Sequence, residues 1–377
     1  MTYFARVPET GSPLKLVLVG AGAMGRVWSK VISEEPAAQL VGIIDLDPTL
    51  AHAAVDELGL MDVAIGSSVT KLASVIEVDA VVNVTVPGAH YSVNSESLRL
   101  GLPVLCEKPI VPTVAEAIEL AALAEATGQL LMTSQSRRYY RTLFQFGETV
   151  ALLGDIGMLS TDFHTGPHFG GFRDEMEHPL LLDMAIHAFD AARFVLVAEP
   201  VSVYCDAFNP SWSWYRGDAC AVAVFEMSGG ARYIFTGSWC SQGLNTSWNG
   251  SWIARGAHGA SSWDGSERPI VDSPEALYVA DSASAQPEEM AGSLREFINS
   301  LRTGTTPYGN IHSNVWSLAM VQSAVESAES GVKVDVRALV EEAYLAARAS
   351  STGDVLARLT SWPGGAEGLE LTSSTAE

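Results

Sequence analysis

Three chargeable side chains stand at a regular spacing in the apolar stretch HPLLLDMAIHAFD, residues 178–190. If this stretch is a helix, offsets of four and then three residues place Asp183, His187 and Asp190 on one face. Burying a carboxylate without a partner is costly, so this face meets either structural hydrogen-bond partners or a wet, reactive cleft. An imidazole titrates near neutral pH, which suits His187 to acid–base chemistry.

A glycine-rich loop lies near the N-terminus, in the segment KLVLVGAGAMGRVWSKVI. Gly20, Gly22 and Gly25 stand directly after a predicted strand and at the opening of a predicted helix. In this G-x-G-x-x-G pattern the first glycine permits a tight turn, the second lets the backbone approach a pyrophosphate, and the third lets the helix pack close to the strand. The pattern predicts a dinucleotide site, and a tight turn that binds no nucleotide is the alternative.

The acid that ends the second predicted strand bears on the choice of cofactor. Asp45 closes the run GIID, twenty residues after Gly25. A carboxylate there can accept hydrogen bonds from the adenosine ribose and repel a 2′-phosphate, so we expect NAD in preference to NADP. Asp47 is the other candidate for this role, although the Pro48 that follows it is typical of the start of a helix.

A lysine follows a later predicted strand, in the run GLPVLCEKPI. A doubly wound sheet presents its ligands at the carboxyl ends of its strands, so Lys108 is expected to point toward the nucleotide crevice. On composition alone an isolated lysine is more often a solvated surface residue.

The composition limits the class of protein. The chain has 377 residues, which suits two domains, and a formal net charge of −22 with only 22 Lys and Arg, which argues against nucleic-acid binding. No segment has the roughly 18 consecutive apolar residues of a membrane helix, and the first residues lack the apolar core of a secretory signal, so we expect a cytoplasmic protein. Four cysteines without C-x-x-C pairing indicate neither a zinc site nor a disulfide framework.

The elements that position these residues change in character along the chain. Residues 14–137 alternate short Val-, Ile- and Leu-rich runs with helical stretches, which predicts a doubly wound parallel sheet of the α/β class, a Rossmann domain. Residues 138–336 carry longer alternating runs such as VSVYCDAF and ACAVAVFEM, which predict an α+β domain on a large, mostly antiparallel sheet. Helical periodicity marks residues 288–303 and 313–330, and residues 363–377 are expected to form a flexible tail.

The glycine loop, the EKP run and the Asp183-x-x-x-His187 pair occur in the order and at the separations found in the Gfo/Idh/MocA family, which this chain resembles from about Leu14 to Val336. Two further segments, VTVPGAHY (residues 84–91) and SQSRRYY (residues 134–140), also resemble family segments. The resemblance implies a Rossmann domain and a C-terminal domain with a large open sheet that often makes oligomer contacts, so a homodimer or homotetramer is expected. The helices at about 310–330 are expected to pack back on the Rossmann domain.

The resemblance also implies roles for individual residues. Lys108 matches the lysine that contacts both cofactor and substrate, Asp183 the substrate-binding acid, and His187 the catalytic acid/base; Asp190 is left as a structural partner. The cofactor-binding set implied by the glycine loop and the family segments is Gly20, Gly22, Ala23, Met24, Gly25, Asp45, Thr85, Pro87, His90, Glu107, Lys108 and Gln135. The usual Gln-Asn pair of the family is here Gln135-Ser136.

The implied activity is that of a dehydrogenase acting on CH–OH groups in carbohydrate metabolism. It transfers hydride between a secondary hydroxyl of a sugar, sugar derivative or inositol-like polyol and NAD. Trp212, Arg173 and His168 are candidates for the substrate pocket, with Lys108, Asp183 and His187. A metal site built from the histidines is the weaker interpretation, because no ligating carboxylate pattern accompanies them. The rival functions are NAD-dependent glycoside cleavage through transient oxidation, and a non-catalytic nucleotide-binding regulator.

Overall fold

The computed structural model describes residues 3–8, 11–274 and 287–369. These form two compact units. Unit 1 comprises Met1–Ser136, Pro287–Val315 and Glu341–Glu377, and unit 2 comprises Arg137–Gln286 and Trp316–Val340. The division between the units therefore falls at four points along the chain, and the last two lie inside helices, α9 (Ile311–Ser330) and α10 (Val336–Ser350).

Unit 1 contains a six-stranded sheet in the order β3-β2-β1-β4-β5-β6, with every neighbouring pair parallel. Its strands are β1 (Leu14–Val19), β2 (Ala38–Ile44), β3 (Ala64–Gly66), β4 (Ala80–Asn83), β5 (Val104–Glu107) and β6 (Leu131–Ser134). The strand order reverses direction at β1, as in doubly wound sheets. The predicted Rossmann architecture is confirmed.

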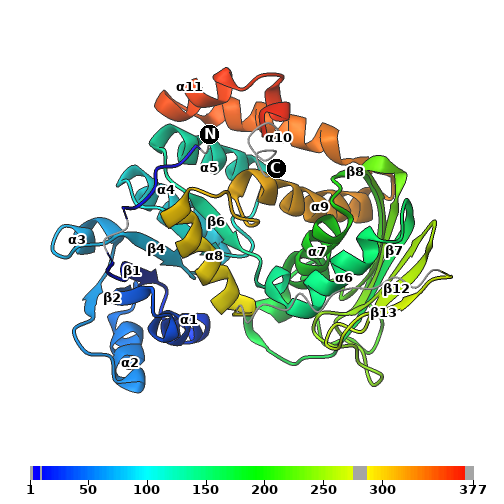
Figure 1. The fold of residues 1–377 in the computed structure, drawn as a ribbon, viewed down its shortest axis with the longest axis horizontal. Helices are drawn as coiled ribbons and strands as arrows, with labels where there is room; N and C mark the ends of the chain where they lie inside the picture. The colour runs from blue at the N-terminus through cyan, green and yellow to red at the C-terminus, as the bar shows by residue number, and fades with distance from the viewer. Residues whose placement is uncertain (1–2, 9–10, 275–286, 370–377) are drawn as a thin grey trace. The chain divides into compact units, whose positions relative to one another are not determined.

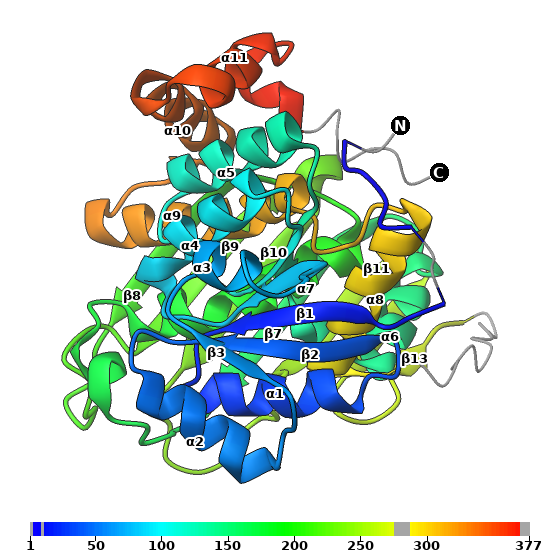
Figure 2. The same ribbon diagram turned by 90° about the vertical axis from the view of Figure 1, so that its left-hand side faces the viewer.

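The helices of this unit lie on both sides of its sheet. Those that lie wholly within the unit are α1 (Ala23–Glu34), α2 (Pro48–Leu58), α3 (Val69–Ala73), α4 (Pro87–Arg99), α5 (Val114–Thr127), α8 (Glu289–Thr303) and α11 (Gly353–Ser361). Figure 2 shows α1 and α2 on one side of β1 and β2, and α4 and α5 on the other. Both faces of the sheet are thus covered, which explains why every residue of β4 is buried.

Unit 2 is built on an eight-stranded sheet in the order β13-β12-β11-β7-β10-β9-β8-β14. The strands are β7 (Ile156–His164), β8 (Pro200–Phe208), β9 (Cys220–Met227), β10 (Arg232–Ser238), β11 (Ser251–Gly256), β12 (Gly259–Trp263), β13 (Ile270–Asp272) and β14 (Val334–Asp335). All neighbours are antiparallel except β7 and β10, which run parallel. The expected large, mostly antiparallel sheet is confirmed.

Helices cover one face of this sheet. In Figure 1, α6 (Arg141–Ala151) and α7 (Ile186–Leu196) lie against the sheet that contains β7. Side chains alternate along the strands between this covered face and the opposite one. On β9, for example, Ala223 and Phe225 are buried whereas Val222 and Val224 are 40% and 38% exposed.

The observed division differs from the expected boundaries of 14–137 and 138–336. Residues 287–315 belong to unit 1, because the buried face of α8, which includes Leu294 and Phe297, packs there. Residues 341–369 do so as well: the Trp362 indole donates a hydrogen bond to Glu125 Oε2 at 3.0 Å, and Leu369 is fully buried. The expected tail is therefore packed at residues 363–369, and residues 370–377 lie outside the described part of the chain.

Within the described residues, no helix has both the length and the apolar character needed to cross a bilayer.

Candidate active site

The glycine loop of unit 1 leaves room above one of its three glycines. Gly20 has a φ of +103°, and a Cβ there would stand 2.8 Å from the Val84 carbonyl oxygen. A Cβ on Gly25 would lie 2.1 Å from the Gly20 oxygen, whereas one on Gly22 would meet nothing within 4 Å. A larger residue at position 20 or 25 would thus clash with neighbouring backbone atoms. Gly22, at the N-terminus of α1, lies beside open space where a phosphate can approach the backbone.

Asp45 is hydrogen-bonded to this loop. Its Oδ2 accepts from the backbone N–H of Ala21 at 2.7 Å, and its Oδ1 accepts from that of Asp47 at 2.9 Å. Asp47 has a different role, because its side chain accepts from the N–H of Thr49 and caps α2. Of the two acids weighed from the sequence, Asp45 is the one beside the glycine loop.

The loop after β4 is connected to the segment after β5 through His90. The two ring nitrogens lie 2.7 Å from the carbonyl oxygen of Pro109 and 3.0 Å from that of Thr85. Burial is the main cause that lowers the pKa of His90, so the ring is neutral at neutral pH and donates one N–H. His90 is 1% exposed, and its observed contacts are with these two loops. Pro87 begins α4.

Lys108 directly follows β5 and is half-buried. The preceding Glu107 accepts a hydrogen bond from the Trp28 indole at 2.9 Å and another from the Lys108 backbone N–H at 3.1 Å. Burial raises the pKa of Glu107. The Lys108–Pro109 peptide is cis. Trp28 on α1 thus helps to hold the Glu107–Lys108 segment, a role that the sequence did not reveal.

Gln135 follows β6, which pairs with β5 through Ser134 and Glu107. Its side chain is 1% exposed, and neither its amide nitrogen nor its amide oxygen has a hydrogen-bond partner among the described residues. An unsatisfied buried amide costs about 1–3 kcal/mol, so this side chain is suited to binding a water molecule or a polar ligand.

Unit 1 therefore gathers the predicted cofactor residues at the carboxyl ends of β1, β2, β4, β5 and β6. This edge combines an open helix N-terminus, an acid beside it and a buried amide in need of partners, which fits a dinucleotide. Two residues that the sequence did not single out support the edge. They are Trp28 and Asn83, whose Oδ1 accepts from the N–H of Thr85 at 3.2 Å.

In unit 2 the stretch 178–190 is not one regular α-helix. Residues Leu180–Ala185 form a π-helix (η3), and α7 begins at Ile186. A π-turn shifts the helical spacing and is often found at functional sites. Asp183 lies in this π-helix, where its Oδ2 accepts from Arg173 Nε at 2.7 Å. Asp183 and Asp190 contact different partners, Arg173 and Arg138 respectively.

His187 lines a small cavity within unit 2. The cavity has mostly apolar walls, with polar groups from Arg137, Thr161 and Asn249. Its other lining residues are Leu143, Phe163, Met184, Ala188, Ala191, Trp248, Trp252 and Trp263. Arg137 donates to Asn249 Oδ1 at 2.6 Å and also to the Trp248 carbonyl oxygen. An imidazole beside a few polar groups in apolar surroundings is a composition shared with ligand sites, and the enclosed space itself has room for about one water molecule.

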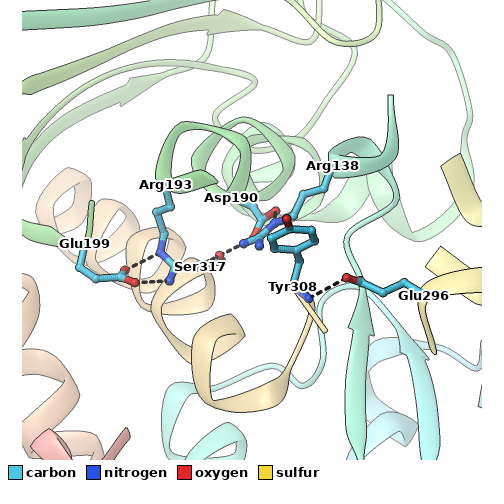
Figure 3. Close-up of polar contacts among 7 residues, drawn as sticks. All are labelled: Arg138, Asp190, Arg193, Glu199, Glu296, Tyr308 and Ser317. Carbon is cyan, nitrogen blue, oxygen red and sulfur yellow. Dashed lines mark hydrogen bonds and ion pairs between the residues drawn. The ribbon is translucent and has the colours of Figure 1, made fainter. Parts of the chain in front are cut away.

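Asp190 is held by a buried network that Figure 3 shows. Its carboxylate accepts from Arg138 Nε at 2.5 Å, from Arg138 Nη2 at 2.7 Å and from Ser317 Oγ at 2.6 Å. Arg193 also contacts Ser317 Oγ at 2.6 Å and forms an ion pair with Glu199. Asp190 is therefore a structural partner, as expected, and it fixes α7 one turn beyond His187. Arg138 belongs to the SQSRRYY segment, but the sequence did not indicate its partner.

Unit 2 also contains the predicted substrate residues His168 and Trp212. His168 is exposed, and its ring stacks on Trp214 with centroids 3.7 Å apart; Trp212 is 62% exposed. His178 is buried and faces Asp218 and Glu329. No group of three or more His, Cys, Asp or Glu side chains in residues 3–8, 11–274 and 287–369 is arranged to hold a metal ion.

Comparison with protein families matches both units of this chain. Residues 14–135 match the model described as "Oxidoreductase family, NAD-binding Rossmann fold", and residues 151–260 match the "GFO/IDH/MocA C-terminal domain". The chain belongs to the Gfo/Idh/MocA family. As a member of this family it is an oxidoreductase whose cofactor is NAD.

Individual relatives are distant. The chain is 24% identical over 349 residues to the uncharacterized protein y4oX of Sinorhizobium fredii, covering 87% of this chain and 97% of that one. It is 28% identical over 204 residues to inositol 2-dehydrogenase 1 of Paenarthrobacter aurescens, covering 53% of this chain and 59% of that enzyme. A crystal structure of an Agrobacterium radiobacter oxidoreductase in complex with NAD+, L-tartaric acid and magnesium has the same fold, with a TM-score of 0.76, 19% identity and coverage of 87% and 100%.

Proposed function

We propose that this Gfo/Idh/MocA oxidoreductase is a dehydrogenase that oxidises a secondary hydroxyl of a sugar, sugar derivative or inositol-like polyol. The observation that carries the proposal is His187, an acid/base side chain that lines a cavity with apolar walls and a few polar groups. The likeness to an inositol 2-dehydrogenase supports a polyhydroxylated substrate. Trp248, which lines the same cavity and is 47% exposed, supports a sugar ring, because an aromatic face can pack on its C–H groups.

His187 and Lys108 have complementary parts in the proposed reaction. His187 takes the proton of the substrate hydroxyl while the hydride leaves the same carbon, so that the alcohol becomes a ketone. Bound NAD supplies the hydride acceptor. The ammonium of Lys108 stabilises the negative charge that develops on the substrate oxygen. Both residues are assigned to one reaction on the family motifs that they match.

Asp183 and Arg173 are proposed to position the substrate. Their ion pair, with side chains 15% and 33% exposed, leaves donor and acceptor atoms near solvent. A carboxylate held by a guanidinium keeps its charge and can accept hydrogen bonds from a substrate hydroxyl. His168 and Trp212 are proposed to border the same pocket. In unit 1, Gly22, Asp45 and Gln135 are proposed to contact the cofactor.

The proposal includes the assembly and the compartment. The outer face of the unit 2 sheet exposes Tyr204, Val222 and Val224 at 49%, 40% and 38%, which supports a homodimer or homotetramer through this face. All four cysteines are free and buried, which is consistent with a reducing compartment such as the cytoplasm.

The test follows NADH absorbance with purified protein, NAD and a panel of free sugars, inositols and glycosides. We expect NADH with one substrate class, its loss in His187→Ala and Lys108→Ala, and no change in the matched control His258→Ala, which removes an exposed imidazole from a hairpin. Glycoside breakdown without net NADH would instead establish the transient-oxidation reaction. Binding of NAD without turnover of any compound would favour the regulator.

A further inference from the structure

Unit 2 exposes a group of aromatic rings beside the His187 cavity. Phe169, Phe172 and Trp248 are 55%, 58% and 47% exposed. We call these three residues the aromatic patch. Scattered exposed hydrophobic residues are normal, but rings that contact one another and remain exposed usually mark a binding surface.

The members of the patch are in contact through stacking and a guanidinium. Phe169 stacks on Trp248, with ring centroids 6.2 Å apart and planes at 27°. The guanidinium carbon of Arg173 lies 5.5 Å from the centre of the Phe169 ring and 4.7 Å from that of Phe172. Such cation–π contacts fix the rings relative to Arg173.

The patch is continuous with the proposed catalytic residues of the same unit. Trp248 lines the cavity that His187 lines. Arg173, which lies over the other two rings, is hydrogen-bonded to Asp183 at 2.7 Å. A substrate that reaches His187 and Asp183 therefore has exposed aromatic faces next to it.

A buried scaffold supports the Phe169 ring. Phe169 packs edge-on against Trp239, which is fully buried and stacks on Tyr215 at 5.7 Å and 11°. The Tyr215 hydroxyl donates to the Pro167 carbonyl oxygen at 2.9 Å. The Phe169 ring is thus held before any ligand arrives, which lowers the entropy cost of binding on it.

We infer that the aromatic patch is a subsite for a second ring of the substrate, joined by a glycosidic bond to the sugar that is oxidised. This inference rests on the proposed function, and it narrows the substrate class from free sugars and inositols to glycosides. A single polyol bound at His187 would leave the patch in contact with water, whereas a glycosyl or aryl group linked to it covers these rings and gains their stacking.

The test compares binding of methyl and phenyl glycosides of glucose, galactose and mannose to the full-length protein loaded with NAD, by isothermal titration calorimetry. For the sugar that binds, we expect the phenyl glycoside to bind roughly 3- to 10-fold more tightly than the methyl glycoside, which is the range of one good aromatic contact. Phe169→Ala should bring this ratio close to one. Phe169→Tyr, which keeps the ring, should retain it.

The control is Leu345→Ala, which removes a similarly exposed apolar side chain from α10 and should leave the ratio unchanged. Equal affinity for methyl and phenyl glycosides, no binding of any glycoside, or a ratio that survives Phe169→Ala would each overturn the inference. Loss of self-association in Phe169→Ala, seen by sedimentation velocity with the ratio intact, would make the patch a subunit contact instead. If the affinity ratio of phenyl to methyl glycoside changes as expected in these variants but no compound yields NADH, the inference that the aromatic patch binds a second ring is supported and the dehydrogenase assignment is wrong.

Discussion

Removing the Asp190 carboxylate should be among the most damaging single changes in unit 2. The side chains of Arg138 and Asp190 are 6% and 2% exposed, so Asp190→Ala leaves a guanidinium buried without its charge partner. Breaking a buried pair in this way costs about 3–5 kcal/mol. The hydrogen bond from Ser317 to the carboxylate is lost as well, at about 1 kcal/mol. We therefore expect the free energy of unfolding to fall by about 4–6 kcal/mol.

The assay is urea unfolding followed by tryptophan fluorescence. Trp28 and Trp362 belong to unit 1, which leaves seven of the nine tryptophans in unit 2, so the signal reports mainly on the unit that contains the pair. The double variant Arg138→Met with Asp190→Leu removes both charges. Its decrease in the free energy of unfolding should be at least about 2 kcal/mol smaller than the sum of the decreases in the single variants Arg138→Met and Asp190→Leu. Single losses below about 1 kcal/mol, or additive losses, would refute the argument that the pair is buried and coupled.

Further predictions concern unit 1. Gly22→Ala should weaken NAD binding, measured by calorimetry, with little change in melting temperature. Gly25→Ala should destabilise the fold by about 1–3 kcal/mol, because its Cβ meets the Gly20 oxygen. Equal melting temperatures for the two variants would contradict this. Asp45→Ser should reduce the preference for NAD over NADP in binding assays, and unchanged selectivity would show that another residue sets it. Because burial lowers the pKa of His90, the unfolded chain takes up a proton below about pH 6.5 that the folded protein does not. The stability that comes from the neutral ring is therefore present above that pH and lost as the pH falls. The free energy of unfolding, measured in urea at pH 7.5 and at pH 5.5, should differ less between the two pH values in His90→Gln than in the unchanged protein.

The parallel sheet of unit 1 was predictable because its strands are short apolar runs that stop at Gly, Pro or Asp. Gly128 ends α5 in a left-handed conformation, and Ser228–Gly230 connects β9 to β10. The short strand β3 was missed, since three half-buried residues carry no periodic signal. In unit 2, β7 and β11–β13 were missed because Gly, Ser and Trp interrupt their alternation.

The candidate site was predictable only where local pattern determines it. The glycine loop and Asp45 act over a short stretch of chain, so their contact follows from a βαβ unit. The partners of Asp183 and Asp190 could not be predicted, because Arg173 and Arg138 reach them from separate short 3-10 helices, Gly171–Glu175 and Ser136–Tyr139. The π-helix that contains Asp183 was also unexpected, since a one-residue change in helical spacing leaves no mark in the apolar pattern.

The order in which the two units can be completed follows from the way that unit 1 is assembled from three stretches of chain. Unit 2 ends at Val340, but unit 1 still requires Glu341 and the residues after it. During synthesis the nucleotide-binding unit is therefore the first to begin and the last to be finished. A fragment that stops at Ser136 would lack α8 and α11, so Glu125 would lose the indole of Trp362, and the fragment would be a poor stand-in for the cofactor-binding half of the enzyme.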